Sequence, residues 1–228
     1  MFFNVAQALL PVLVFSLVLY QIDYIRPKST GKSAYATVHQ YHAMSYYERN
    51  LPHWRPEGKA IFLTWRLYGS LPAVVVQQVQ SHKIKSCLTS GQEFADFDQH
   101  LDHAQFGPLW LKNTMIADSV VSTLRKGQDE LNQYMLHAYV VMANHIHLLL
   151  VPRIALARIT RGMKGITSRN ANRILARTGQ PFWQDESFDR WARDSAEEER
   201  IRKYIESNPV KAGLVAKPED WPWSSAHK

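Results

Sequence analysis

The sequence contains, past its midpoint, the run Tyr139-Val140-Val141-Met142-Ala143-Asn144-His145-Ile146-His147-Leu148-Leu149-Leu150-Val151-Pro152. Side chains alternate between the two faces of a strand, so His145 and His147 share one face while the isoleucine between them points to the other. Ala143-Asn144 predicts a tight hairpin turn, because asparagine tolerates a left-handed conformation. Two histidines on one strand face form a possible metal-ligand pair. The alternative is two hydrogen-bonded histidines in a half-buried strand, because a cation needs further ligands.

Composition limits the class of protein. The chain has 228 residues, 46% of them hydrophobic and 11% aromatic, which predicts a folded domain with a core and excludes a disordered chain. A net charge of +7 favours an anionic partner, either nucleic acid or an anionic membrane surface. The single cysteine, Cys87, excludes an intramolecular disulfide framework and a cysteine-rich zinc site, and fits a reducing, cytoplasmic location.

Residues 1–44 differ from the rest of the chain. Residues 1–20 are almost wholly apolar and uncharged, long enough to cross a bilayer, and the basic residues that follow would hold the remaining chain in the cytoplasm. Alternatively, the apolar leader and its polar linker arise from a misassigned start, and Met44 begins the protein. Membrane contact is expected only if residues 1–20 are a genuine anchor. A single compact domain is expected over residues 45–228.

The pattern of this domain is that of an α+β protein. It predicts an antiparallel sheet with helices on one face. The last helix begins at a capping box formed by Ser195 and Glu198 and ends before Pro209. Strands are expected at residues 59–67, 133–142 and 145–151, helices at 71–88, 109–126 and 155–177, and a polar loop at 93–107.

Basic residues are concentrated on two of the predicted helices. On the helix at 155–177, Arg169, Arg173 and Arg177 follow one another at intervals of four, which predicts contacts with a phosphate backbone. An ordinary solvated basic face is the alternative. Tyr204 and Asn208 are four residues apart and share a face of the last helix. The candidate DNA-binding residues are Arg161, Lys164, Arg169, Arg173, Arg177, Arg200 and Lys203.

Several of these motifs together resemble the REP-associated tyrosine transposases, relatives of the single-tyrosine HUH transposases of bacterial insertion sequences. The resemblance covers about residues 45–225, in the family's order. Two departures from the family pattern are Ala143, where relatives commonly have proline, and Phe188, where many have tyrosine. The motifs that carry the resemblance are residues 46–54, 64–72, 142–148 and 182–184, together with the run from Arg202 to Val215.

The resemblance implies a fold, a substrate and a site. The implied fold is a ferredoxin-like antiparallel sheet in one catalytic domain with extra C-terminal helices. The implied substrate is single-stranded or hairpin DNA of the REP palindrome type. His145, His147 and Asn208 would hold a divalent metal, and Tyr204 would be the nucleophile. The substitution at Phe188 removes a rival nucleophile and supports Tyr204.

The chemistry of such a site is transesterification. In the reaction that the resemblance implies, Tyr204 would attack the phosphorus in line and form a 5′-phosphotyrosine, while the metal would neutralise the phosphate charge. Because an ordinary tyrosine has a pKa of about 10, Arg200, Lys203 or the metal would have to favour its phenolate. Mg²⁺ or Mn²⁺ is expected, with no small-molecule cofactor, in a monomer or homodimer.

Two other functions stay open at the level of sequence. The first is a nucleic-acid-binding protein that keeps the transposase fold and no longer cuts. The second is a membrane-anchored metal hydrolase in which the same two histidines activate water. The hydrolase would need an additional general base, and no carboxylate lies beside the histidines in the sequence.

Overall fold

The computed structural model describes residues 45–48, 52–55, 58–72, 98–102, 107–185 and 187–228. The leader and the helix predicted at residues 71–88 therefore lie almost entirely outside the described residues. Strands β1 (Ser45–Glu48) and β2 (Pro52–Arg55) pair as a separate antiparallel hairpin. In this described part of the chain, no helix is long and apolar enough to span a membrane.

The main sheet has four antiparallel strands in the order β4-β5-β3-β6. Its central strand, β5, is buried from His145 to Leu150 because it has a neighbour on each edge. Both histidines consequently lie in the middle of the sheet, away from its solvated edges. The strands are β3 (Ile61–Arg66), β4 (Tyr134–Val141), β5 (His145–Pro152) and β6 (Phe188–Trp191).

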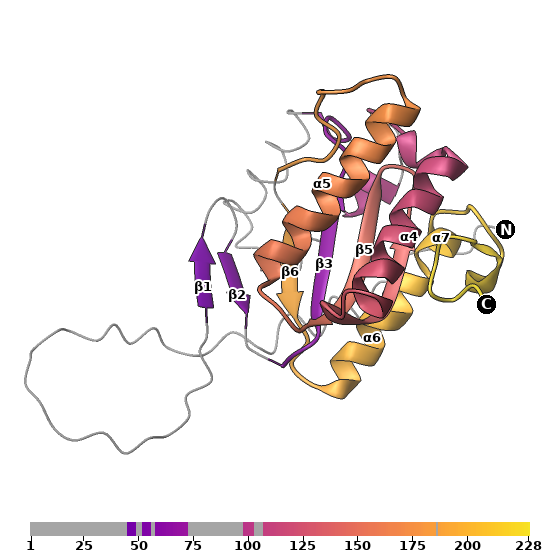
Figure 1. Cartoon of the computed structure of the whole chain (residues 1–228). Coiled ribbons are helices and arrows are strands. Elements are labelled where there is room, and N and C mark those ends of the chain that lie inside the picture. The colour runs from indigo at the N-terminus through magenta and orange to yellow at the C-terminus, as the bar shows by residue number, and fades with distance from the viewer. Residues whose placement is uncertain (1–44, 49–51, 56–57, 73–97, 103–106, 186) are drawn as a thin grey trace, which may run out of the picture.

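Helices α4 (Thr114–Asp129) and α5 (Leu156–Ile174) lie side by side over one face of the sheet (Figure 1). The alternate apolar residues of β5, Ile146, Leu148 and Leu150, form one core with these helices. The described elements follow the order β3-α4-β4-β5-α5-β6, which together with the strand order is a ferredoxin-like arrangement. The predicted α+β fold class is confirmed.

The opposite face of the sheet is partly covered by the C-terminal helix α6 (Ser195–Glu206). A second core forms there from Leu149 of β5, neighbouring strand residues and Ile205. Because strand side chains alternate, His145 and His147 point toward this second face. A short helix, α7 (Asn208–Lys211), follows directly, and two 3₁₀ turns complete the described elements at Trp110–Lys112 and Pro218–Asp220.

Four local expectations were wrong. Residues 98–102, predicted as part of a loop, are helical, and the short strand β6 was not predicted. The N-cap of α6 is Asp194, whose carboxylate accepts the Glu197 backbone N–H at 2.7 Å, so the capping box at Ser195 does not form. Asn144 does not adopt a positive φ.

Candidate metal centre and nucleophile

His145 and His147 project from the same face of β5 and are completely buried. Their Nε2 atoms lie 3.0 Å apart. Two ligands about 2.1 Å from one ion and at right angles to each other are separated by about 3.0 Å, so this spacing suits a shared divalent cation. The expectation that the two rings share a strand face is confirmed.

The orientation of both rings is fixed by hydrogen bonds to their other nitrogen. The Nδ1 atom of His145 is 2.7 Å from Oδ1 of Asn144, and Nδ1 of His147 is 2.7 Å from the hydroxyl of Thr64, which lies directly opposite in strand β3. Since an amide oxygen only accepts, His145 Nδ1 carries the proton and its Nε2 has a free lone pair. The Thr64 hydroxyl can accept from His147 in the same way.

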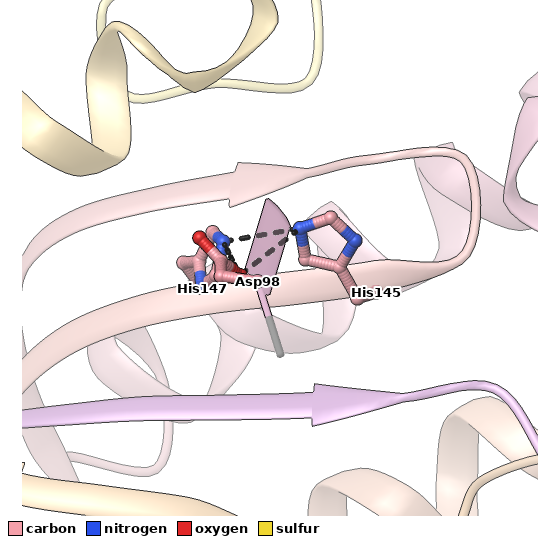
Figure 2. Close-up of side chains that lie close together, drawn as sticks. All are labelled: Asp98, His145 and His147. Atoms are coloured by element: carbon pink, nitrogen blue, oxygen red, sulfur yellow. Dashed lines mark hydrogen bonds and ion pairs between the residues drawn. The ribbon is translucent and has the colours of Figure 1, made fainter. Parts of the chain in front are cut away.

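Asp98 completes a three-residue cluster with the histidines (Figure 2). Its Oδ1 atom lies 3.2 Å from Nε2 of His147 and 3.9 Å from Nε2 of His145. Within the described part of the chain, the ligand atoms of this cluster all lie within 4.8 Å of one another. Asp102, one helical turn after Asp98, places a second carboxylate oxygen 3.6 Å from Nε2 of His145.

Protonation states at the cluster match those of metal ligands. Burial, and to a smaller extent the nearby His147, lower the pKa of His145 to about 3, against a smaller opposing effect of Asp98. Burial alone would raise the pKa of Asp98, but electrostatic attraction to His147, with smaller contributions from His145 and Lys211, outweighs that effect and holds the pKa below its usual value. At neutral pH the cluster therefore offers a neutral imidazole and a carboxylate, the forms that bind a cation.

Asn208 supplies a further oxygen beside the cluster. It is the first residue of α7 and is fully buried, and its Nδ2 lies 3.4 Å from Nε2 of His147. Its Oδ1 and the Oδ1 of Asp98 are both buried, and neither has a hydrogen-bond partner among the described residues. Buried polar atoms without partners are costly. A divalent cation would satisfy both, so the donor set fits the metal that the resemblance implies.

A small cavity gives solvent access to this buried cluster. Its volume is about 200 Å³, and it is lined by His145, Asn144 and Asp102 together with apolar side chains such as Met142 and Leu101. An entry path is a requirement for a buried metal site. A cation can therefore reach His145 without unfolding of the sheet.

Tyr204 lies next to the cluster on helix α6. Its ring packs edge-on against Phe62, with centroids 6.1 Å apart, and lies 5.9 Å from the ring of His147. Its hydroxyl donates a hydrogen bond to Oδ2 of Asp98. One carboxylate oxygen of Asp98 thus contacts the phenol, and its other oxygen faces the histidine nitrogens that are candidate metal ligands.

The two cations predicted to flank Tyr204 are Arg200 and Lys203, and the structure adds a third, Lys211, which contacts its ring. Lys203 is exposed and pairs with Glu199 at 3.5 Å, and Arg200 is also exposed. Lys211, at the end of α7, instead places its Nζ 3.9 Å from the centroid of the Tyr204 ring. Lys211 is exposed, and partial desolvation of its ammonium by the site lowers its pKa, an effect that attraction to Asp102 and Asp98 offsets in part.

The basic residues of α5 lie on the other side of the sheet from Tyr204. Arg161, Arg169 and Arg173 are exposed on the outer side of this helix. Lys164 is held internally, since its Nζ donates to the carbonyl oxygens of Gln184 at 2.9 Å and Asp185 at 3.0 Å.

Arg177 lies beyond the end of α5, not on its basic face. Its guanidinium stacks on Trp110 at 3.7 Å and donates from Nε to the side chain of Gln180 at 3.0 Å. The predicted row at intervals of four is therefore helical only as far as Arg173.

Sequence reasoning missed Asp98, Asp102, Thr64 and Lys211. The two aspartates are one helical turn apart, a spacing that places two carboxylates on one helix face, but they lie in a segment that was predicted as a loop. Thr64 could be found only through the register of β3 with β5. Lys211 follows Asn208 by three residues and was visible as a cation one turn after a candidate ligand.

Residues 110–208 match the family model described as "Transposase IS200 like". That stretch contains His145, His147, Tyr204 and Asn208, and over these residues the match confirms the predicted resemblance to the single-tyrosine transposases. The match supports a transposase-like role for this stretch of the chain. No curated protein gives a significant match.

Two solved structures are similar to the chain. One is a REP-associated tyrosine transposase bound to a REP hairpin, with 18% identity and a TM-score of 0.47, covering 81% of this chain and 84% of the other. The second is a protein described as a transposase of Deinococcus radiodurans R1, with 14% identity and a TM-score of 0.29, covering 65% of this chain and 89% of the other.

Proposed function

We propose, from the premise that this chain carries an IS200-like transposase region, that it is a metal-dependent endonuclease and strand transferase for single-stranded DNA. In this proposal Tyr204 forms a 5′-phosphotyrosine intermediate, and His145, His147, Asn208 and Asp98 hold a divalent cation, Mg²⁺ or Mn²⁺. The catalytic unit is residues 45–228. The proposed substrate is an unpaired strand next to a REP-type palindromic hairpin.

One observation carries the proposal. The Tyr204 hydroxyl donates to one oxygen of Asp98, while the other oxygen of that carboxylate lies 3.2 Å from Nε2 of His147. A phenol tethered to a candidate metal ligand is positioned to attack a phosphate bound at the same cation. A tyrosine that served only to pack would not need its hydroxyl directed into a buried group of ionisable side chains.

The proposed reaction is a single in-line displacement at phosphorus. The phenol oxygen of Tyr204 forms a bond to phosphorus, the bond from phosphorus to the 3′-oxygen breaks, and the departing strand takes a proton to become a 3′-hydroxyl. Asp98 is placed to accept the phenol proton as the new bond forms. The reverse attack by a 3′-hydroxyl rejoins DNA and restores the tyrosine.

A cation at this site would neutralise charge on the scissile phosphate and polarise it toward attack. The histidines contribute by presenting unprotonated Nε2 atoms, because each ring donates a hydrogen bond from Nδ1, His145 to Asn144 and His147 to Thr64, which directs Nε2 toward Asp98. Burial of both rings excludes competing water from their Nδ1 atoms.

A metal hydrolase is the second candidate, and one observation favours it. The sequence placed no carboxylate beside the histidines, but the structure places Asp98 and Asp102 there, so a general base for water is present. The two functions differ in their product. A hydrolase releases a free 5′-phosphate, whereas a transesterase leaves the 5′ end on the protein.

The test is to incubate the full chain with Mn²⁺ and a labelled DNA carrying a hairpin and an unpaired flank. A denaturing gel then shows whether label migrates with protein. We expect an adduct with the wild type, none with Tyr204→Phe or His147→Ala, and a reduced amount with Asn208→Ala, because water can replace an amide ligand. Tyr139→Phe, which removes the hydroxyl that accepts from Arg125, is the matched control and should form the adduct normally.

Efficient cutting by Tyr204→Phe without any adduct would establish the hydrolase instead. Binding of the hairpin without cutting by the wild type, under every divalent cation tried, would favour the non-cutting binding protein.

A further inference from the structure

Lys211 ends α7, the short helix that Asn208 begins. This helix follows α6 directly, so the chain turns immediately after Tyr204 and returns Lys211 toward it. The Nζ of Lys211 lies 3.9 Å from the centroid of the Tyr204 ring. The same short element thus carries both a candidate metal ligand and a cation in contact with the candidate nucleophile.

Lys211 is also attracted to the acidic side of the site. Asp102 and Asp98 both interact electrostatically with its ammonium, and the flexible four-carbon stem allows the charge to move by several ångströms between partners. Lys203 makes a useful contrast because it belongs to the same region but pairs with Glu199 on the surface of α6. Of these two lysines, only Lys211 contacts the nucleophile.

We propose that Lys211 is a catalytic residue that binds a non-bridging oxygen of the scissile phosphate during attack by Tyr204. This inference rests on the proposed function and adds a group to it. A phosphorus poised for attack lies about 3–3.5 Å from the phenol oxygen, which brings its non-bridging oxygens within reach of an ammonium resting on the same ring. Lys211 donates a hydrogen bond and keeps its proton, so the bonds formed and broken are those already described.

The geometry also explains how the ammonium becomes available to DNA. In the described structure the carboxylates of Asp98 and Asp102 attract it. When a cation binds to those carboxylates, it neutralises part of their negative charge and weakens their attraction for Lys211. The ammonium can then bind a phosphate oxygen more favourably. A cation aimed at charge that develops in the transition state accelerates chemistry more than it strengthens binding.

The experiment measures single-turnover adduct formation by the full chain at saturating hairpin DNA and saturating Mn²⁺. Lys211→Met keeps an apolar stem against Tyr204 and removes the charge, and we expect the rate to fall on the order of 10²-fold, with little change in DNA affinity. Lys211→Arg should recover a substantial part of that loss. Lys217→Met is the matched control, since it removes an exposed surface charge from the same C-terminal region, and should cleave like the wild type.

A second substrate distinguishes phosphate contact from a structural role. A methylphosphonate at the scissile linkage has no negative charge, so the Lys211→Met penalty should largely disappear on it. An equal penalty on both linkages would overturn the proposal, as would a wild-type rate for Lys211→Met. If Lys211→Met does not fold, Lys211→Gln is compared on the two linkages in the same way. Absence of an adduct with the wild-type protein would contradict the proposed function itself, a result distinct from either of these.

Discussion

Both candidate histidine ligands have a neighbour that fixes the orientation of the ring, and Thr64 is the clearer case. Its hydroxyl is 2.7 Å from Nδ1 of His147, a contact that the sequence did not predict. Loss of a partner that orients a metal-binding histidine typically lowers metal affinity by about 10–100-fold. Thr64→Val keeps the shape of the side chain and removes only the hydrogen bond, so we expect a loss of Mn²⁺ affinity in this range, measured by calorimetry.

Thr167→Val is the control for this change. Thr167 is as buried as Thr64, and its hydroxyl accepts from the indole of Trp183 at 2.8 Å on the other face of the sheet. The control should lose stability but keep its Mn²⁺ affinity. An equal loss of affinity in both variants would mean that the effect is general destabilisation, and would remove Thr64 from the site.

The buried His145 should make the metal-free protein sensitive to acid. Its pKa is about 3 in the folded protein and about 6.5 in an unfolded chain. Between these two pH values the unfolded chain is protonated at this histidine and the folded protein is not. The free energy of unfolding therefore falls as pH decreases, by up to about 1.4 kcal/mol per pH unit. Above about pH 6.5 this histidine has no effect on it. Urea unfolding in EDTA from about pH 7.5 to about pH 5 measures this slope.

His145→Gln cannot titrate and should flatten that dependence. His227→Gln, which replaces an exposed histidine near the C-terminus, should retain the wild-type slope. A wild-type slope in His145→Gln would show that groups other than His145 control the acid response.

At the scale of elements, the packing of α4 against β4 depends on Gly127. A Cβ at this position would lie 2.1 Å from the hydroxyl of Tyr134, a fully buried side chain whose hydroxyl donates to the carbonyl of Leu124 at 2.6 Å. Overpacking of this kind costs about 1–3 kcal/mol. We therefore expect Gly127→Ala to lower the free energy of unfolding, although alanine is the better helix former.

Gly162→Ala on α5 provides the matched comparison. A Cβ there would have no neighbour within 4 Å, so only helix propensity changes, and the free energy of unfolding should rise by up to about 1 kcal/mol. Urea unfolding of both variants tests the pair. A higher free energy of unfolding for Gly127→Ala would contradict this expectation. It would mean that Tyr134 can move away from the new methyl group without loss of stability.

Elements with a strong pattern were predictable from the sequence, and those held by distant contacts were not. Strand β5 could be predicted because alternation placed its apolar residues on one face and its histidines on the other. Strand β6 is four residues long and is defined by pairing with β3, so no local pattern marks it. Similarly, the carboxylate of Asp98 reaches the histidines only because residues 98–102 fold as a helix over the site.

At the scale of the molecule, the sheet separates two sets of functional candidates. The metal cluster and Tyr204 lie on the α6 face, whereas Arg169 and Arg173 are exposed on α5, which packs on the other face. A residue that far from the scissile phosphate can add to DNA affinity through other phosphates, but cannot take part in the displacement. Binding and cleavage should therefore respond separately to changes on α5.

The double variant Arg169→Gln/Arg173→Gln tests this separation with the labelled hairpin. Each lost phosphate contact should reduce the slope of log affinity against log salt by about 0.7–0.9, and so by about 1.5 for the pair. The cleavage rate at saturating DNA should stay at the wild-type value. An interaction that stabilises the bound DNA and the transition state equally changes only the DNA concentration needed for saturation.

The control for that variant is Lys126→Gln/Lys217→Gln, which removes the same net charge from surface positions outside α5. It should leave the salt slope close to the wild type. Equal loss in the control would mean that affinity follows total charge and not a DNA path along α5. The cleavage rate at saturating DNA could also fall in the α5 variant and not in the control. Because both variants lose the same net charge, that result would mean that α5 helps to position the DNA for cleavage. The two faces of the sheet would then act as one site, and the separation inferred from their positions would be wrong.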